Sequence, residues 1–100
     1  MQDAKEVKIL IVDDDDINRC GLTTILRNTG YEIKEATKGK EALRKAETEN
    51  PNLIILAVNL PDITGYEVCE QLKLNPITEF IPILCMSSYY IKNLKIGFTD

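Results

Sequence analysis

Short apolar runs alternate with amphipathic segments along the chain, and this alternation most limits the folds open to it. Strands are expected at residues 7–12, 31–36, 53–58 and 81–86, and helices at 17–29, 39–49, 64–74 and from Ser88 onward. Wholly apolar runs of this length are typical of strands that are buried on both faces of a sheet. Such alternation predicts an α/β fold with a doubly wound parallel sheet and helices on both faces.

Several helix ends are marked by residues with specific capping chemistry. Asp15 or Asp16 is suited to cap the first helix, because a carboxylate accepts hydrogen bonds from free backbone N–H groups. Gly30 is suited to end the same helix. Thr64 and Glu67 form the Thr-x-x-Glu pattern of a capping box, which predicts the start of the third helix.

The composition is that of one ordinary globular domain. The chain has 100 residues, of which 44% are hydrophobic and 28% are charged, and its formal net charge is −4. Nucleic-acid binding usually requires a clustered basic face, so we expect no direct nucleic-acid partner. The longest apolar run, residues 53–58, is too short to cross a bilayer, so we expect no membrane insertion.

Three cysteines and the lack of histidine limit the metal and redox chemistry of the chain. Cys20, Cys69 and Cys85 are far apart in sequence and form no C-x-x-C pair, which argues against a zinc site. We expect three reduced thiols in the core, as is typical of a cytoplasmic protein.

Four successive aspartates, residues 13–16, follow the first strand. In doubly wound sheets, ligands bind at the carboxyl ends of the strands, where the strand order reverses. Crowded carboxylates repel one another, and Mg²⁺ relieves this repulsion with oxygen ligands. We therefore expect Asp13 and Asp14 to bind a cation, whereas Asp15 and Asp16 cap the helix. A calcium EF-hand is excluded, because Arg19 stands at the glycine position of its loop.

Four stretches, in order and at the proper spacing, resemble the receiver domain of two-component response regulators. They are residues 9–14 with the acidic pair, 53–68 with the third strand and its loop, 81–88 with a switch hydroxyl, and 97–100 before a fifth strand. The resemblance implies a flavodoxin-like (CheY-like) fold in which residues 1–100 form one receiver domain. It also implies that the fifth strand, the last helix and the family's phosphate-binding lysine are missing after Asp100. We expect such a chain to expose the fourth strand and part of one apolar face, and either to associate with itself or to lean on residues that are absent from it.

The resemblance assigns a role to five positions. Asp14 would bind Mg²⁺ directly and Asp13 largely through water, and the backbone carbonyl of Asn59 would complete the protein ligands. Ser87 would hydrogen-bond a phosphoryl oxygen and act as the switch. The aspartate that accepts the phosphoryl group in the family falls on Ala57, either by natural loss or by deliberate substitution. A methyl group cannot attack phosphorus, so we expect no phosphoryl transfer at this position and only weak Mg²⁺ binding.

The leading function is a phosphorelay receiver domain that is not an enzyme and is disabled at Ala57. Its expected partners are a sensor histidine kinase and an output domain or effector protein. One alternative is a small Mg²⁺-dependent phosphatase or phosphotransferase with Asp13 as nucleophile and Asp15 as general acid. The other is a pseudo-receiver that binds partners without phosphate or metal.

Overall fold

The computed structural model describes residues 7–86, in which four strands alternate with three helices. The strands are β1 (Lys8–Val12), β2 (Glu32–Ala36), β3 (Leu53–Ala57) and β4 (Ile83–Met86). The helices are α1 (Asp16–Arg27), α2 (Gly39–Glu49) and α3 (Gly65–Leu74). Every strand and helix predicted within this range is confirmed, with ends that differ by at most two residues. The helix expected from Ser88 onward lies outside the described residues.

All strand pairs are parallel, and the order across the sheet is β2-β1-β3-β4. The chain moves outward from β1 to β2 and then returns to the other side of β1 to form β3. The strand order therefore reverses between β1 and β3, which is the place where doubly wound sheets bind their ligands. Val12 of β1 pairs with Ala36 on one side and with Leu56 on the other.

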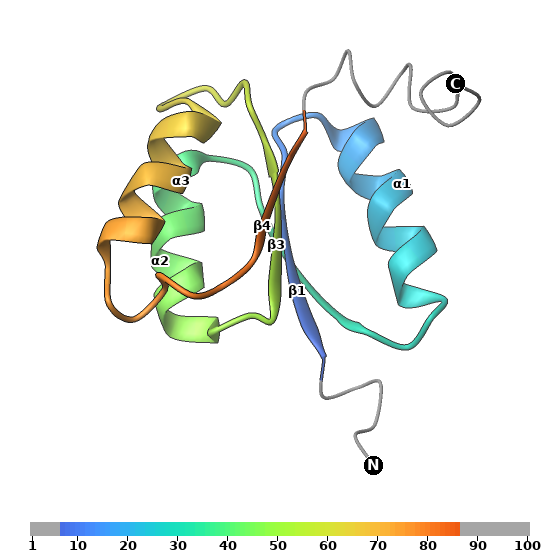
Figure 1. The fold of residues 1–100 in the computed structure, drawn as a ribbon. Helices are drawn as coiled ribbons and strands as arrows, with labels where there is room; N and C mark the ends of the chain where they lie inside the picture. Colours follow the sequence, from blue (N-terminus) through green and yellow to red (C-terminus); the bar gives the residue numbers. More distant parts are fainter. Residues whose placement is uncertain (1–6, 87–100) are drawn as a thin grey trace, which may run out of the picture.

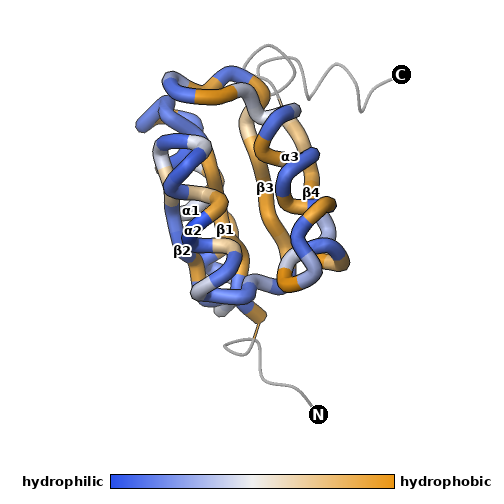
Figure 2. The backbone as a smooth tube through the Cα atoms, turned by 90° about the vertical axis from the view of Figure 1, so that its left-hand side faces the viewer, coloured by the Kyte–Doolittle hydropathy of each residue, from blue (hydrophilic) through white to orange (hydrophobic). Residues whose placement is uncertain are grey.

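Helices cover both faces of the sheet, as predicted for a doubly wound fold. Helix α1 lies on one face, and α2 and α3 lie together on the other (Figure 1). Each face has its own core because successive strand residues point to opposite sides. The core under α2 and α3 contains Leu10, Val12, Ile54 and Leu56, and the core under α1 contains Ile9, Ile11 and Ile55. Figure 2 shows the apolar residues gathered along β1, β3 and β4.

Local capping explains where the helices begin and end. The Asp15 carboxylate accepts hydrogen bonds from the backbone of Ile17 and Asn18, which confirms Asp15 as the cap of α1. The Thr64 hydroxyl accepts one from the Glu67 N–H, which confirms the predicted start of α3. Asn50 ends α2 in the left-handed region with φ of 47°, a conformation that asparagine tolerates better than most residues.

Strand β4 is less buried than its apolar sequence suggests. Leu84 is 50% exposed and Cys85 is also exposed, which contradicts the buried strand that the apolar run predicts and agrees with the expected exposure of the fourth strand. The reason is position in the sheet: within residues 7–86, β4 pairs only with β3 and forms an edge. The prediction of three core thiols is likewise wrong for Cys85 and for Cys20, although all three cysteines are free.

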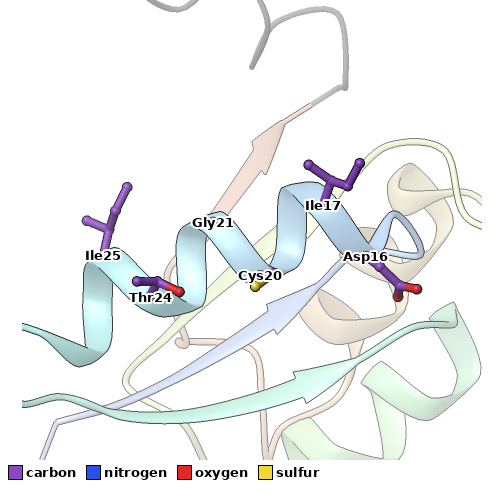
Figure 3. Close-up of a pocket in the computed structure, with 6 residues that line it drawn as sticks. All are labelled: Asp16, Ile17, Cys20, Gly21, Thr24 and Ile25. Carbon is purple, nitrogen blue, oxygen red and sulfur yellow. The ribbon is translucent and has the colours of Figure 1, made fainter.

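Helix α1 also exposes apolar residues on its outer surface. Asp16, Ile17, Cys20, Gly21, Thr24 and Ile25 line a shallow apolar pocket there (Figure 3). Ile17 and Ile25, two turns apart, point away from the sheet, and Gly21 lies between them (Figure 3). Cys20 lies on this outer surface of α1, and for this reason its thiol is exposed and not in the core.

Candidate functional site at the carboxyl edge of the sheet

The predicted site residues come together at the carboxyl ends of β1 and β3. Asp13 directly follows β1, and Ala57 is the last residue of β3. Because Val12 pairs with Leu56, Asp13 and Ala57 stand at the same level on neighbouring strands. Asn59 follows two residues later in an exposed loop. The sheet topology therefore places an acidic group beside the alanine, at the point where the strand order reverses.

Asp13 and Asp14 differ sharply in their surroundings. The Asp13 side chain is 4% exposed, and its Oδ1 accepts a hydrogen bond of 2.9 Å from the Asp15 N–H. Burial raises the pKa of Asp13, and the negative charges of Asp14 and Asp15 add to this, against the opposing effects of the Asp15 N–H and Arg19. Asp14 is exposed. A cation at this edge would be bound by one buried and one exposed carboxylate.

The other two aspartates act in the helix, as predicted. Asp15 accepts hydrogen bonds of 2.9 Å from the Ile17 N–H and 3.1 Å from the Asn18 N–H. Asp16 lies in the first turn of α1, where its carboxylate pairs with Arg19 at 2.6 Å. Negative charge in this turn is favourable because the N-terminus of a helix carries a partial positive charge.

Arg19 connects the acidic loop to two elements, a role that sequence reasoning missed. Its guanidinium donates to the Asp13 carbonyl oxygen at 2.8 Å, to Asp16 at 2.6 Å and to Glu35 of β2 at 2.9 Å. Arg19 is the sole basic residue between Lys8 and Arg27. Its place shortly after four aspartates was the sequence signal that could have indicated this role. Arg19 therefore fixes the backbone at Asp13 and offsets part of the local negative charge.

The loop after β3 folds back tightly against the end of that strand. The Gly65 N–H donates a hydrogen bond of 2.7 Å to the Val58 carbonyl oxygen. A Cβ atom at Gly65 would lie 2.2 Å from the Ala57 carbonyl oxygen, so a side chain cannot be accommodated without moving the backbone. Gly65 thus sets the close approach of α3 to the strand end that carries Ala57.

The pattern of the response regulator receiver domain family matches residues 9–99 of the chain. The chain belongs to this family. It is 44% identical over 81 residues to the alkaline phosphatase synthesis transcriptional regulatory protein PhoP of Bacillus subtilis, and this match covers 81% of the chain and 33% of that protein. The probable transcriptional regulator ycf27 of Cyanophora paradoxa is 41% identical over 98 residues, which cover 93% of the chain and 40% of that protein. The receiver domain thus spans a third to two fifths of the length of these relatives.

Solved receiver structures have the same fold. A putative response regulator from Chloroflexus aurantiacus superimposes with a TM-score of 0.79 and 36% identity, and the match covers 91% of this chain and 79% of that one. The chemotaxis protein CheY4 of Vibrio cholerae gives a TM-score of 0.75 and 33% identity, with 90% and 78% covered. This receiver domain is therefore a module of two-component signalling.

Asp62 of the receiver domain is bound to a neighbouring helix. Its two carboxylate oxygens accept hydrogen bonds from the backbone N–H groups of Gly39 at 2.7 Å and Lys40 at 2.9 Å. These bonds lower the pKa of Asp62 to about 2. Lys38, the residue before α2, makes no capping hydrogen bond with its side chain. Asp62 caps this helix instead. Asp62 is the first acidic residue after Ala57 in the sequence, and both of its carboxylate oxygens are thus engaged in capping α2.

Two further observations concern the predicted cofactor and switch. Among the described residues, no group of three or more histidine, cysteine, aspartate or glutamate side chains is arranged to hold a metal ion. Ser87, the predicted switch hydroxyl, lies outside the described residues, although it follows Met86, which pairs with Ala57. In the described part of the receiver domain, no helix has the length and apolarity needed to span a membrane.

Proposed function

We propose that this receiver domain binds the partners of a response regulator but does not accept a phosphoryl group on position 57. The observation that supports this most is Ala57, which stands beside Asp13 at the switch point of the sheet. Acceptance requires an oxygen nucleophile, and a methyl group has no lone pair to attack phosphorus. On this proposal the domain is not an enzyme, and it stays unphosphorylated at position 57. Its output domain or effector therefore always contacts the same state of the receiver domain.

The proposed Mg²⁺ site is weak and consists of Asp13, Asp14 and the backbone carbonyl of Asn59. The donor set fits a hydrated magnesium ion, because this ion is often held by one or two carboxylates and several waters. When bound, the ion would neutralise charge on a phosphoryl oxygen. The buried Asp13 carboxylate, crowded by two acidic neighbours, is the group that gains most from a cation. Without a third carboxylate at position 57, the site binds Mg²⁺ less tightly, and the carboxylates at this edge repel one another less.

The phosphatase alternative is disfavoured by two contacts. A nucleophilic Asp13 would have to reach substrate, but its side chain is 4% exposed and one oxygen is bound to the Asp15 N–H. Asp15, the acid that this mechanism needs, caps α1 instead. The pseudo-receiver alternative differs from the leading proposal only in lacking a Mg²⁺ response, so a metal titration separates the two.

Three other parts of the proposal concern partners and place. We propose a sensor histidine kinase and an output domain as partners because these are the partners of receiver domains in response regulators. Self-association is supported by the exposed Leu84 on β4, which is an edge strand within residues 7–86. The cytoplasmic location stays a prediction.

The test compares this chain with an Ala57→Asp variant after incubation with Mg²⁺ and a small phosphodonor. We expect the intact mass of the variant to rise by one phosphoryl group, while the mass of the Ala57 chain stays unchanged. A gain in both would contradict the proposal, because it requires a second nucleophile such as Asp13 or Asp62. If neither gains the group, a longer chain that includes the family's fifth strand and lysine decides whether those parts are needed. A variant that stays unmodified in that longer chain too would overturn the proposal.

A further inference from the structure

Two of the three cysteines face the same side of the sheet. Ile83 of β4 packs against the core cluster under α2 and α3, and side chains two residues apart on a strand point to the same face. Cys85 therefore points toward this side, as does Leu56, the residue with which it pairs on β3. Cys69 of α3 packs against the same cluster. Cys69 and Cys85 thus both lie on the side of the sheet that α2 and α3 cover.

The Cys69 and Cys85 thiols are also close enough to influence each other. Burial raises the pKa of Cys85, and the neighbouring Cys69 thiol raises it further through charge and hydrogen bonding. Cys85 is exposed and Cys69 is half-buried, so a small reagent has access to the pair. The third cysteine, Cys20, lies on α1 (Figure 3), which covers the opposite face of the sheet (Figure 1).

We propose that Cys69 and Cys85 form a dithiol site that closes to an intramolecular disulfide by exchange with a small disulfide such as oxidised glutathione. One protein thiolate attacks the small disulfide, forms a mixed disulfide and releases one glutathione thiolate. The second protein thiolate then displaces the other glutathione. In total the two protein thiols lose two electrons and two protons, and the glutathione disulfide is reduced to two glutathione thiols.

The bond would link two elements that meet at the functional end of the sheet. It closes the loop of residues 69–85 and ties α3 to β4, the strand that leads into Ser87. A cross-link across a loop restricts the unfolded chain, so the oxidised domain should melt at a higher temperature than the reduced one. Because the thiolate is the attacking species, the raised pKa of Cys85 slows the exchange, and the test is therefore run to equilibrium.

The test uses the unaltered chain in glutathione buffers of increasing oxidation, followed by acid quenching and alkylation of free thiols. Cleavage after lysine and arginine places the cysteines in three different peptides, residues 20–27, 46–73 and 74–92. We expect peptide 46–73 to be linked to peptide 74–92, in at least about tenfold excess over either link to peptide 20–27. The intact protein should be lighter by about 2 Da, and added reductant should restore its mass.

Two comparisons make the outcome decisive. The same titration in urea removes the folded geometry, and the three possible links should then differ only by loop length, which favours the link between Cys69 and Cys85 by roughly five- to eightfold. The folded chain should exceed that ratio. The Cys20→Ser variant should still form the bond, whereas Cys69→Ser and Cys85→Ser should each prevent it. The proposal is overturned if the folded chain yields only mixed disulfides with glutathione. It is equally overturned if Cys20 is linked as often as the proposed pair, or if the folded chain forms the bond no more readily than the chain in urea.

Discussion

Single residues at the carboxyl edge of the sheet place negative charge where water is scarce. Asp13 is buried beside Asp14 and Asp15, and its pKa is raised mainly by burial. The ionised carboxylate is consequently less favourable in the folded protein than in the unfolded chain. The same crowding would favour a bound cation at the proposed Mg²⁺ site.

Asp13→Asn should therefore stabilise the domain at neutral pH. Asparagine retains an oxygen for the Asp15 N–H and removes the charge. The folded pKa lies above the unfolded value of 3.8, so the cost of ionisation is absent below pH 3.8 and develops as the pH rises through the folded pKa. We expect a thermal midpoint that is higher by a few degrees at pH 7 and almost unchanged below pH 3.8. Circular dichroism melting at both pH values measures this.

The exposed Asp14 supplies the matched control for this change. Asp14→Asn removes an equal charge from a solvated position, so its effect at neutral pH should be smaller. An Asp13→Asn protein that melts at or below the temperature of the unaltered chain at pH 7 would show that burial does not penalise this carboxylate.

Arg19 shows how one side chain holds the acidic loop in place. Arg19→Met removes three charge-assisted hydrogen bonds from a side chain that is 16% exposed. We expect the free energy of unfolding in urea to fall by about 1–3 kcal/mol. Arg27→Met is the control: its contact with Glu35 is 3.8 Å long and its side chain is 59% exposed, so the loss should stay below about 0.5 kcal/mol. Equal losses for both variants would argue against the bridging role.

At the scale of elements, the contacts between α3 and the end of β3 define the geometry of the site. Gly65, the first residue of α3, lies against the backbone of Ala57 and Val58. The Asp62 carboxylate in the same loop caps α2, so one short segment joins β3, α2 and α3. This segment therefore fixes the first turns of both helices relative to the end of β3.

Gly65→Ala and Gly21→Ala should have opposite effects on stability. The added Cβ at Gly65 would lie 2.2 Å from the Ala57 carbonyl oxygen, so we expect a loss of about 3 kcal/mol or more. At Gly21, inside α1, nothing lies within 4 Å of an added Cβ, so we expect a gain of about 0.5–1 kcal/mol from helix propensity. Urea unfolding of both variants tests the pair. A harmless Gly65→Ala change would mean that the loop packs less closely than described.

At the scale of the whole molecule, the apolar residues are unequally shielded from solvent. Helices cover both faces, but Leu84 of β4 is exposed, as are Leu74, Ile77 and Phe80 at the end of α3 and in the segment that leads to β4. Phe80 is 88% exposed and stands in the segment between α3 and β4. Apolar residues beside a strand edge favour pairing with another chain.

We expect the domain to self-associate through this side in a concentration-dependent manner. Leu84→Lys places a charge on the edge strand and should shift the protein toward monomer in sedimentation velocity experiments. Ile25→Lys changes an equally apolar exposed residue on α1 and should leave the distribution as it was. A stronger effect of the α1 variant would move the interface to the pocket on α1 shown in Figure 3.

Much of this receiver domain was determined by the sequence on its own. Apolar strands and amphipathic helices predicted the α/β fold, because periodicity and capping act over a few neighbouring residues. Strand ends located Asp13, Asp14 and Ala57 at one edge, since parallel strands that alternate with helices share a direction. Family membership was confirmed by the comparisons, and the roles of the site residues stay predictions.

Tertiary structure alone decided which surfaces and contacts these elements form. The exposure of Leu84 and Cys85 depends on the edge position of β4 in the sheet of residues 7–86. An apolar run has the same sequence pattern at the centre and at the edge of a sheet. Arg19 and Asp62 meet partners that lie far away in sequence, Glu35 and the start of α2. The raised pKa of Asp13 likewise depends on burial by neighbouring elements. Such effects arise from the packing of distant segments, which local patterns do not encode.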